Sequence, residues 1–342
     1  MVKKWLAVSA AALVIFTGCS QQKEEAQEHS GKEVEDVGKE VREDSYRSPL
    51  TGIVTETEST DRAFAVMVNN HPVARPQSGL DKADVIYEVL AEGKVTRFLA
   101  IFESEKPEKV GPVRSARDYF IELAKGYDSL YIAHGYSPEA KELLQSGYID
   151  HLNGIQYDGT LFKRADFRKA PHNSYITYDN IKRGAEENGY HMDEAPAALP
   201  FLTKDQAEKL SGEEAGEIMV SYGDPAFDVI YEYDNESQNF HRFNDGEETV
   251  DLDSKQSVLI DNIFIVEMGH QTVDKKGRKS IDLTSGGRGY LFQKGMVNEV
   301  EWKNVDGRIL PFMNGKEAGF LPGKTWINIV PSIDDISFES ES

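Results

Sequence analysis

Short apolar runs separated by turn residues are the feature that most constrains the fold of this 342-residue chain. In the first half, runs at 64–68, 85–90, 98–102 and 129–133 have the length expected of buried strands. Segments 119–125, 138–144 and 178–188 have helical character instead, and we expect Ser115 and Ser137 as N-caps of the first two. Because strands and helices alternate, we predict an α/β (or α+β) sandwich domain over residues 49–200.

The second half of the chain has mostly strand signals. Runs typical of strands occur at 218–220, 227–233, 240–243, 258–266, 289–292, 297–302 and 325–330. Asp-Asn, Asp-Gly and Asn-Gly pairs among these runs are turn signals. We therefore predict a β-rich domain over 215–332, followed by a tail at 333–342.

The N-terminus has the pattern of a bacterial signal peptide. Lys3 and Lys4 precede an apolar run from Trp5 to Phe16, which is short for a membrane span but suits the apolar region of a signal peptide. The small residues that follow lead directly to Cys19, and this arrangement resembles the lipobox of lipoproteins, in which the cysteine carries diacylglycerol. We expect a signal peptide over 1–18 and lipidation with fatty acyl chains such as palmitate at Cys19. The chain would then be anchored to the cell membrane and face outside the cytoplasm.

Charge and cysteine content exclude several other classes. Cys19 is the only cysteine, so an intramolecular disulfide and a thiolate metal cluster are excluded. A formal net charge of −21 argues against a nucleic-acid partner. Residues 21–48 hold nine acidic and five basic side chains and few apolar ones, so we expect 19–48 to be a disordered acidic tether.

Several motifs resemble the YerB-like lipoproteins of Gram-positive bacteria. The motifs are Ala65-Val66-Met67-Val68-Asn69-Asn70, Arg75-Pro76-Gln77-Ser78-Gly79-Leu80, Ala83-Asp84-Val85-Ile86-Tyr87-Glu88, Thr96-Arg97-Phe98, Gly111-Pro112-Val113-Arg114-Ser115-Ala116-Arg117, Ala170-Pro171-His172-Asn173 and Gly323-Lys324-Thr325-Trp326-Ile327. The resemblance covers nearly everything after the tether. It implies a family built on a domain of unknown function, with no established activity.

Arginines are concentrated in the family-resembling motifs of the first domain. Arginine forks bind phosphate or carboxylate bidentately, and a helix start beside Ser115 would add free N–H groups. We therefore hypothesise an anion site, whose predicted members are Arg75, Arg97, Arg114, Ser115, Arg117, Arg168 and His172. The alternative is that these arginines form structural ion pairs with nearby carboxylates such as Asp84 and Glu88. The sequence favours neither.

A looser resemblance suggests an enzymatic alternative. The order of elements is similar to that of the LytR-CpsA-Psr phosphotransferases, which have a first strand, then a strand that carries Arg and Asp, then a strand that leads into an arginine loop. Asp84, Arg97, Arg114 and Arg117 occupy comparable places. This resemblance implies Asp84 or Glu88 as Mg²⁺ ligands. However, the Arg-Ser-Asp and Pro-Arg-Asp triplets typical of that family are absent.

The motifs and the predicted location favour a binding or scaffolding role over catalysis. The sequence indicates an envelope lipoprotein that binds an anionic envelope ligand or an envelope protein, without a cofactor. The alternative is an enzyme of phosphoryl transfer or hydrolysis that acts on a phosphorylated cell-wall or lipid-linked substrate and uses Mg²⁺.

Overall fold

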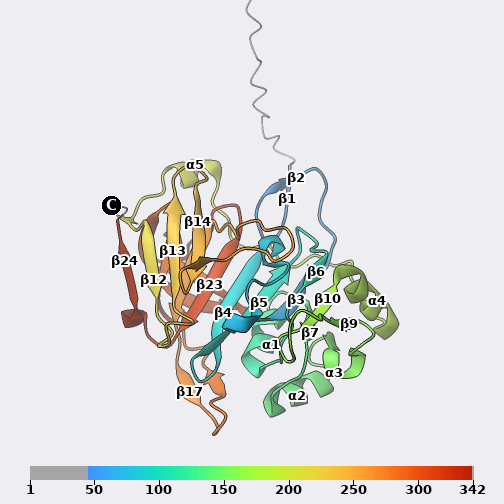
Figure 1. Cartoon of the computed structure of the whole chain (residues 1–342). Coiled ribbons are helices and arrows are strands. Elements are labelled where there is room, and N and C mark those ends of the chain that lie inside the picture. The colour runs from blue at the N-terminus through green and yellow to red at the C-terminus, as the bar shows by residue number, and fades with distance from the viewer. Residues whose placement is uncertain (1–44, 341–342) are drawn as a thin grey trace, which may run out of the picture. The chain divides into compact units, whose positions relative to one another are not determined.

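A mixed sheet of twelve strands, to which both halves of the chain contribute, organises the protein (Figure 1). The computed structural model describes residues 45–340; the predicted signal peptide, Cys19 and most of the predicted tether lie outside the described residues. Eleven strands follow the order β22-β21-β20-β19-β16-β23-β4-β5-β3-β7-β8, and β11 pairs with β20. The strands of the sheet are β3 (Phe64–Asn69), β4 (Val85–Glu92), β5 (Val95–Phe102), β7 (Leu130–Ala133), β8 (His151–Asn153), β11 (Glu213–Glu214), β16 (Asn262–Glu267), β19 (Gly287–Gln293), β20 (Met296–Val305), β21 (Arg308–Met313), β22 (Lys316–Glu317) and β23 (Thr325–Val330).

The central strands of this sheet are buried on both faces. In β3, Phe64, Val66 and Val68 belong to one apolar cluster, and Ala65 and Met67 to another. Side chains of a strand alternate between the two faces, so a strand covered on both sides has a continuous apolar run. This explains why the first-half strands have no alternating polar positions.

A five-stranded antiparallel sheet packs on the first of these clusters. Its order is β15-β14-β13-β12-β24, and it stands to one side of the large sheet in Figure 1. Its strands are β12 (Glu217–Val220), β13 (Val229–Asp234), β14 (Asn239–Asn244), β15 (Glu247–Glu248) and β24 (Ile336–Glu339). The second half therefore has the predicted β-rich character.

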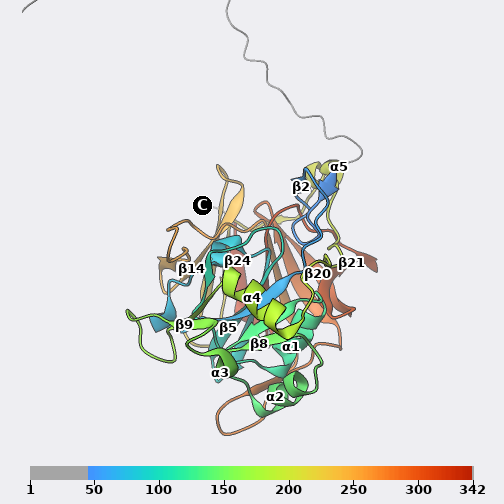
Figure 2. The same cartoon turned by 90° about the vertical axis from the view of Figure 1, so that its right-hand side faces the viewer.

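The helices of the first half cover only part of its surface. Figures 1 and 2 show α1 to α4 gathered near β7 and β8. The α-helices are α1 (Asp118–Lys125), α2 (Pro138–Gln145), α3 (Gly154–Tyr157), α4 (Tyr178–Asn188) and α5 (Lys204–Glu208), and the 3₁₀ helices are η1 (Pro72–Ala74), η2 (Leu80–Lys82) and η3 (Ile333–Asp335). Small sheets are formed by β1 (Tyr46–Arg47) with β2 (Val54–Thr55), by β6 (Lys109–Val110), β10 (Ser174–Thr177) and β9 (Phe162–Arg164), and by β17 (His270–Thr272) with β18 (Lys279–Ile281).

The predicted fold class is confirmed, and three local expectations differ from the structure. Ser137 caps α2 as expected, but the expected cap Ser115 does not cap α1, which begins after Arg117. The Ser115 hydroxyl donates instead to the carbonyl of His134 at 3.1 Å. Tyr46 and Arg47, placed in the tether by the sequence, form β1, and residues 336–339, placed in the tail, form β24 on the edge of β12.

Candidate functional site

Two histidines lie together where β3 leaves the large sheet. His71 follows the last residue of β3 by two positions, and His172 precedes β10. Their ring centroids are 4.8 Å apart. The side chain of Asn69 orders both residues, because its Nδ2 is 2.8 Å from Nδ1 of His172 and its Oδ1 accepts the backbone N–H of His71 at 3.0 Å.

Both imidazoles have a lowered pKa. Burial is the largest cause for each histidine. Arg114 and Arg75 lower the pKa of His71 further, and His71, Arg114 and Arg168 lower that of His172. Burial and the positive charges of three arginines therefore all disfavour the protonated form of these two histidines.

Arg114 is the arginine that both histidines share. Its side chain is half-buried, and its Nη1 donates to the carbonyl of Pro171 at 3.3 Å. Its Nε is buried and has no hydrogen-bond partner among residues 45–340. Among the same residues, no carboxylate forms an ion pair with it, and burial lowers its pKa. Such a guanidinium retains capacity for an external anion.

Arg75 and Arg168 likewise meet no carboxylate within the described part of the chain. Arg75 donates to Asn70 Oδ1 at 3.0 Å and to the carbonyl of Ala226 at 2.8 Å. Arg168 donates to the Tyr175 hydroxyl at 2.5 Å and to the carbonyl of Pro76 at 2.7 Å. Neutral acceptors fix the position of each guanidinium, and the charges of Glu88 and Asp245 act on Arg75 without a direct ion pair.

Arg97 and Arg117 have a structural role instead. Arg97 Nη2 lies 2.6 and 2.8 Å from the two carboxylate oxygens of Glu92, and Arg117 pairs with the same carboxylate. Both guanidinium groups are almost fully buried. The predicted arginine group is thus divided: Arg75, Arg114 and Arg168 surround the histidines, whereas Arg97 and Arg117 follow the ion-pair alternative. The hydroxyl of Ser115 donates to the carbonyl of His134 and makes no hydrogen bond to His71 or His172 among the described residues.

The carboxylates named as Mg²⁺ ligands are already engaged. Asp84 is buried and accepts the backbone N–H groups of Glu103 at 2.5 Å and Ser104 at 2.9 Å. Burial raises its pKa to about 6, although these hydrogen bonds act in the opposite direction. Glu88 is buried and pairs with Arg242 at 2.8 Å. Within residues 45–340, no group of three or more His, Cys, Asp or Glu side chains is arranged to hold a metal ion.

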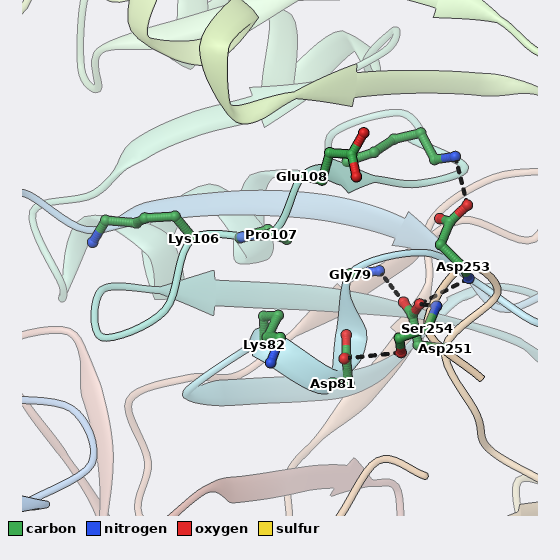
Figure 3. Close-up of a pocket in the computed structure, with 10 residues that line it drawn as sticks. Gly79, Asp81, Lys82, Lys106, Pro107, Glu108, Asp251, Asp253 and Ser254 are labelled. Atoms are coloured by element: carbon green, nitrogen blue, oxygen red, sulfur yellow. Dashed lines mark hydrogen bonds and ion pairs between the residues drawn. The ribbon is translucent and has the colours of Figure 1, made fainter. Parts of the chain in front are cut away.

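A pocket of about 350 Å³ beside η2 is lined by both acidic and basic side chains (Figure 3). Asp81, Asp251 and Ser254 point toward one another there, and Asp251 accepts the backbone N–H of Gly79 at 2.5 Å. Lys109 pairs with Asp253 at 2.9 Å. Asp81 and Asp251 form no ion pair among residues 45–340, and burial followed by the charge of Asp251 raises the pKa of Asp81. These neighbouring acids would repel an anion, so this pocket is a weaker candidate for anion binding than the histidine pair.

Comparison with known proteins identifies the family. Residues 50–191 match the model described as "Protein of unknown function (DUF3048) N-terminal domain", and residues 218–327 match the corresponding C-terminal domain. A protein of Bacillus subtilis (strain 168) named "Putative lipoprotein YerB" is 48% identical over 339 residues, which cover 98% of each chain. The chain belongs to this family.

A solved structure supports the fold of this YerB-like family member. The crystal structure of the YerB protein from Bacillus subtilis has a TM-score of 0.81 and 50% sequence identity, covering 86% of this chain and 99% of that one. The resemblance found in the sequence is therefore confirmed. The family carries no assigned activity. Within residues 45–340, no helix has the length and apolar character needed to cross a membrane.

Sequence reasoning missed His71 and Asn69. Both residues lie in or directly after the Ala65–Asn70 motif, so the motif itself was the available signal. A lone histidine in a loop gives no indication that a second histidine, about a hundred residues later, lies beside it. The two histidines come together because β10, which follows His172, pairs antiparallel with β6.

Proposed function

We propose that this protein is a membrane-anchored lipoprotein of the cell envelope, lipidated at Cys19, whose first domain binds an anionic envelope ligand. The binding surface consists of His71, Arg75, Arg114, Arg168 and His172, and we call it the His71–His172 surface. The observation that carries the proposal is geometric: the two histidine rings lie 4.8 Å apart, and the three arginines beside them donate to backbone carbonyls and form no ion pair with a carboxylate of residues 45–340.

The overall charge of the chain gives this observation its weight. Acidic residues outnumber basic ones by 59 to 38, so an arginine readily finds a carboxylate. Most arginines in the described part of the chain do so, among them Arg62, Arg164 and Arg278. Five arginines of residues 45–340 form no ion pair, and three of these five, Arg75, Arg114 and Arg168, lie around one histidine pair. This grouping favours a ligand that supplies the negative charge.

Replacement of Arg114 with glutamine tests the proposal directly. We expect Arg114→Gln to weaken the binding of inorganic pyrophosphate by roughly 10- to 100-fold, because charge-assisted hydrogen bonds contribute about 1.5–3 kcal/mol. Isothermal titration calorimetry on the mature chain with Cys19→Ser, which keeps the protein soluble, measures this change.

Arg288→Gln is the matched control for Arg114→Gln. Arg288 is exposed on β19, and its replacement with glutamine removes the same charge as Arg114→Gln. The pyrophosphate affinity of Arg288→Gln should therefore stay within about twofold of the wild-type value. Equal affinity for the wild type and Arg114→Gln, with both proteins folded, would refute the proposed site.

Because the proposed surface contains two histidines, we expect anion binding to depend on pH. Their pKa values are lowered in the protein, so the neutral forms contribute stability that is lost as the pH falls below about 6.5. A bound anion favours the protonated forms, and affinity should therefore rise by roughly tenfold between pH 8 and pH 5.5. Sulfate is the suitable probe, because its charge is constant over this range. A flat affinity profile, or an unchanged profile in His71→Gln/His172→Gln, would contradict the prediction.

A further inference from the structure

A second pocket, of about 320 Å³, lies between the loop that follows β3 and the β14–β15 hairpin. The first and second halves of the chain both line it, and its size suits a small organic molecule. The charged residues of its lining are Arg75, Arg242, Asp245, Glu247 and Glu248.

The inner part of this pocket is cationic and rigid. The Arg242 side chain is 1% exposed, and its guanidinium lies over the rings of Phe98 and Trp326, at 5.2 and 4.7 Å from their centroids. It is also held by Glu88 at 2.8 Å and by Thr249 at 2.9 Å. A guanidinium fixed in this way needs no reorganisation when a ligand binds.

Arg75 adds a second cation to the same pocket. Its guanidinium lies 5.6 Å from the centre of the Phe227 ring. Burial, followed by the charge of Arg242, lowers the pKa of Arg75 to about 10, and the charges of Glu88 and Asp245 act in the opposite direction. Glu88 is the only carboxylate paired with either guanidinium among residues 45–340. Arg242 is therefore matched by Glu88, and Arg75 is the cation of the interior that has no direct ion pair and can accept the carboxylate of a ligand.

The outer part of the pocket is acidic. Asp245 and Glu247 are exposed on the β14–β15 hairpin, and Glu248 is hydrogen-bonded to His241 at 2.7 Å. A phosphate or an isolated carboxylate would meet these acids on its way to the arginines. A ligand that also carries a positive group would instead be attracted by both parts of the pocket.

We infer that this pocket binds a small zwitterion, namely a free amino acid or the end of a short peptide. Its carboxylate interacts with Arg242 and Arg75, and its ammonium group interacts with Asp245 and Glu247. The inference goes beyond the proposed function, because the ligand differs from the anion at the His71–His172 surface. Only Arg75 belongs to both sites.

Four related probes test the inference on the mature chain with Cys19→Ser. Alanyl-alanine is compared by calorimetry with its N-acetylated form, with its C-terminal amide and with free alanine. We expect alanyl-alanine or alanine to bind at least about tenfold more tightly than either blocked dipeptide, a difference of roughly 1.4 kcal/mol. Tighter binding of alanine identifies a free amino acid as the ligand class, and tighter binding of the dipeptide identifies a peptide end. The inference would be overturned if the two blocked dipeptides bind as tightly as alanyl-alanine and alanine, or if no probe binds at about 10 mM.

Asp245→Asn separates recognition of the ammonium group from effects on folding. Asp245 has a φ of 53° in the turn before Gly246, a conformation in which asparagine is well tolerated. We expect this variant to bind the zwitterion about tenfold more weakly and the N-acetylated dipeptide equally well. Asp306→Asn is the matched control, since Asp306 has a φ of 51° before Gly307 in the β20–β21 turn, outside the pocket.

Unchanged zwitterion affinity in both Asp245→Asn and Glu247→Gln would also overturn the inference. Arg114→Gln should leave dipeptide binding unchanged, so failure of this site and failure of the His71–His172 surface are distinguishable.

Discussion

Replacement of Arg242 with methionine should lower the free energy of unfolding by about 3–5 kcal/mol, because it leaves a buried carboxylate without its counter-charge. Glu88 is fully buried and pairs with Arg242 at 2.8 Å. Its other partners are neutral: Asn70 and Thr96 donate to Oε1, and the indole of Trp326 donates to Oε2 at 3.3 Å. None of these groups replaces the charge of the guanidinium.

Urea denaturation followed by circular dichroism measures the effect of Arg242→Met. Removing both charges together, in Arg242→Met/Glu88→Leu, should restore most of the lost stability, because a buried ion pair is often no better than apolar residues of similar size. The control Arg288→Met removes an exposed pair and should change stability by no more than about 0.5 kcal/mol. A loss below about 1 kcal/mol in Arg242→Met would show that Glu88 does not need its partner.

Local elements of the fold could be predicted well from the sequence. The runs at 64–68, 85–90 and 98–102 correspond to β3, β4 and β5, since a strand buried on both faces has a continuous apolar segment. Ser137 with Pro138 marked the start of α2 by cap chemistry alone. The start of α1 could not be located in this way, because Arg117 occupies the cap position and makes no side-chain cap bond there.

The composition of the candidate site was predictable only in part, since His71 was missed, and its grouping was not predictable. Arg75, Arg114, Arg168 and His172 were singled out from motifs, and the structure brings them together. The same motifs contain Arg97 and Arg117, whose partner Glu92 lies at the end of β4. Which arginine meets a carboxylate depends on the positions of neighbouring strands, and the local sequence does not contain this information.

The joining of the two halves in one sheet was also beyond the sequence. Residues 325–330 were correctly predicted as a strand, but nothing nearby indicates its neighbours. In the structure β23 lies between β16 and β4 and pairs in parallel with both. Its pairing with β4 joins residues more than two hundred positions apart, whereas most of the remaining second-half pairs are local hairpins. The domains predicted at 49–200 and 215–332 therefore share a continuous hydrogen-bonded sheet.

Separation of the chain at residue 200 should consequently abolish cooperative folding of the first half. A fragment of residues 45–200 loses β23, whose Trp326, Ile327 and Ile329 are buried, and exposes the pairing edge of β4. It also loses Arg242 and leaves Glu88 without a counter-charge. We expect no cooperative urea transition in near-ultraviolet circular dichroism, and association in analytical ultracentrifugation.

Cleavage of the folded full chain provides the control for this fragment. A protease site inserted after Lys209, which is exposed at the end of α5, breaks the same connection after folding. Both pieces should stay together and keep a cooperative transition, because β23 remains between β16 and β4. A 45–200 fragment that unfolds cooperatively as a monomer would show that the first half holds its own core. The shared sheet would then be an interface between two independent domains, and the large loss expected for Arg242→Met would have to come from that interface alone.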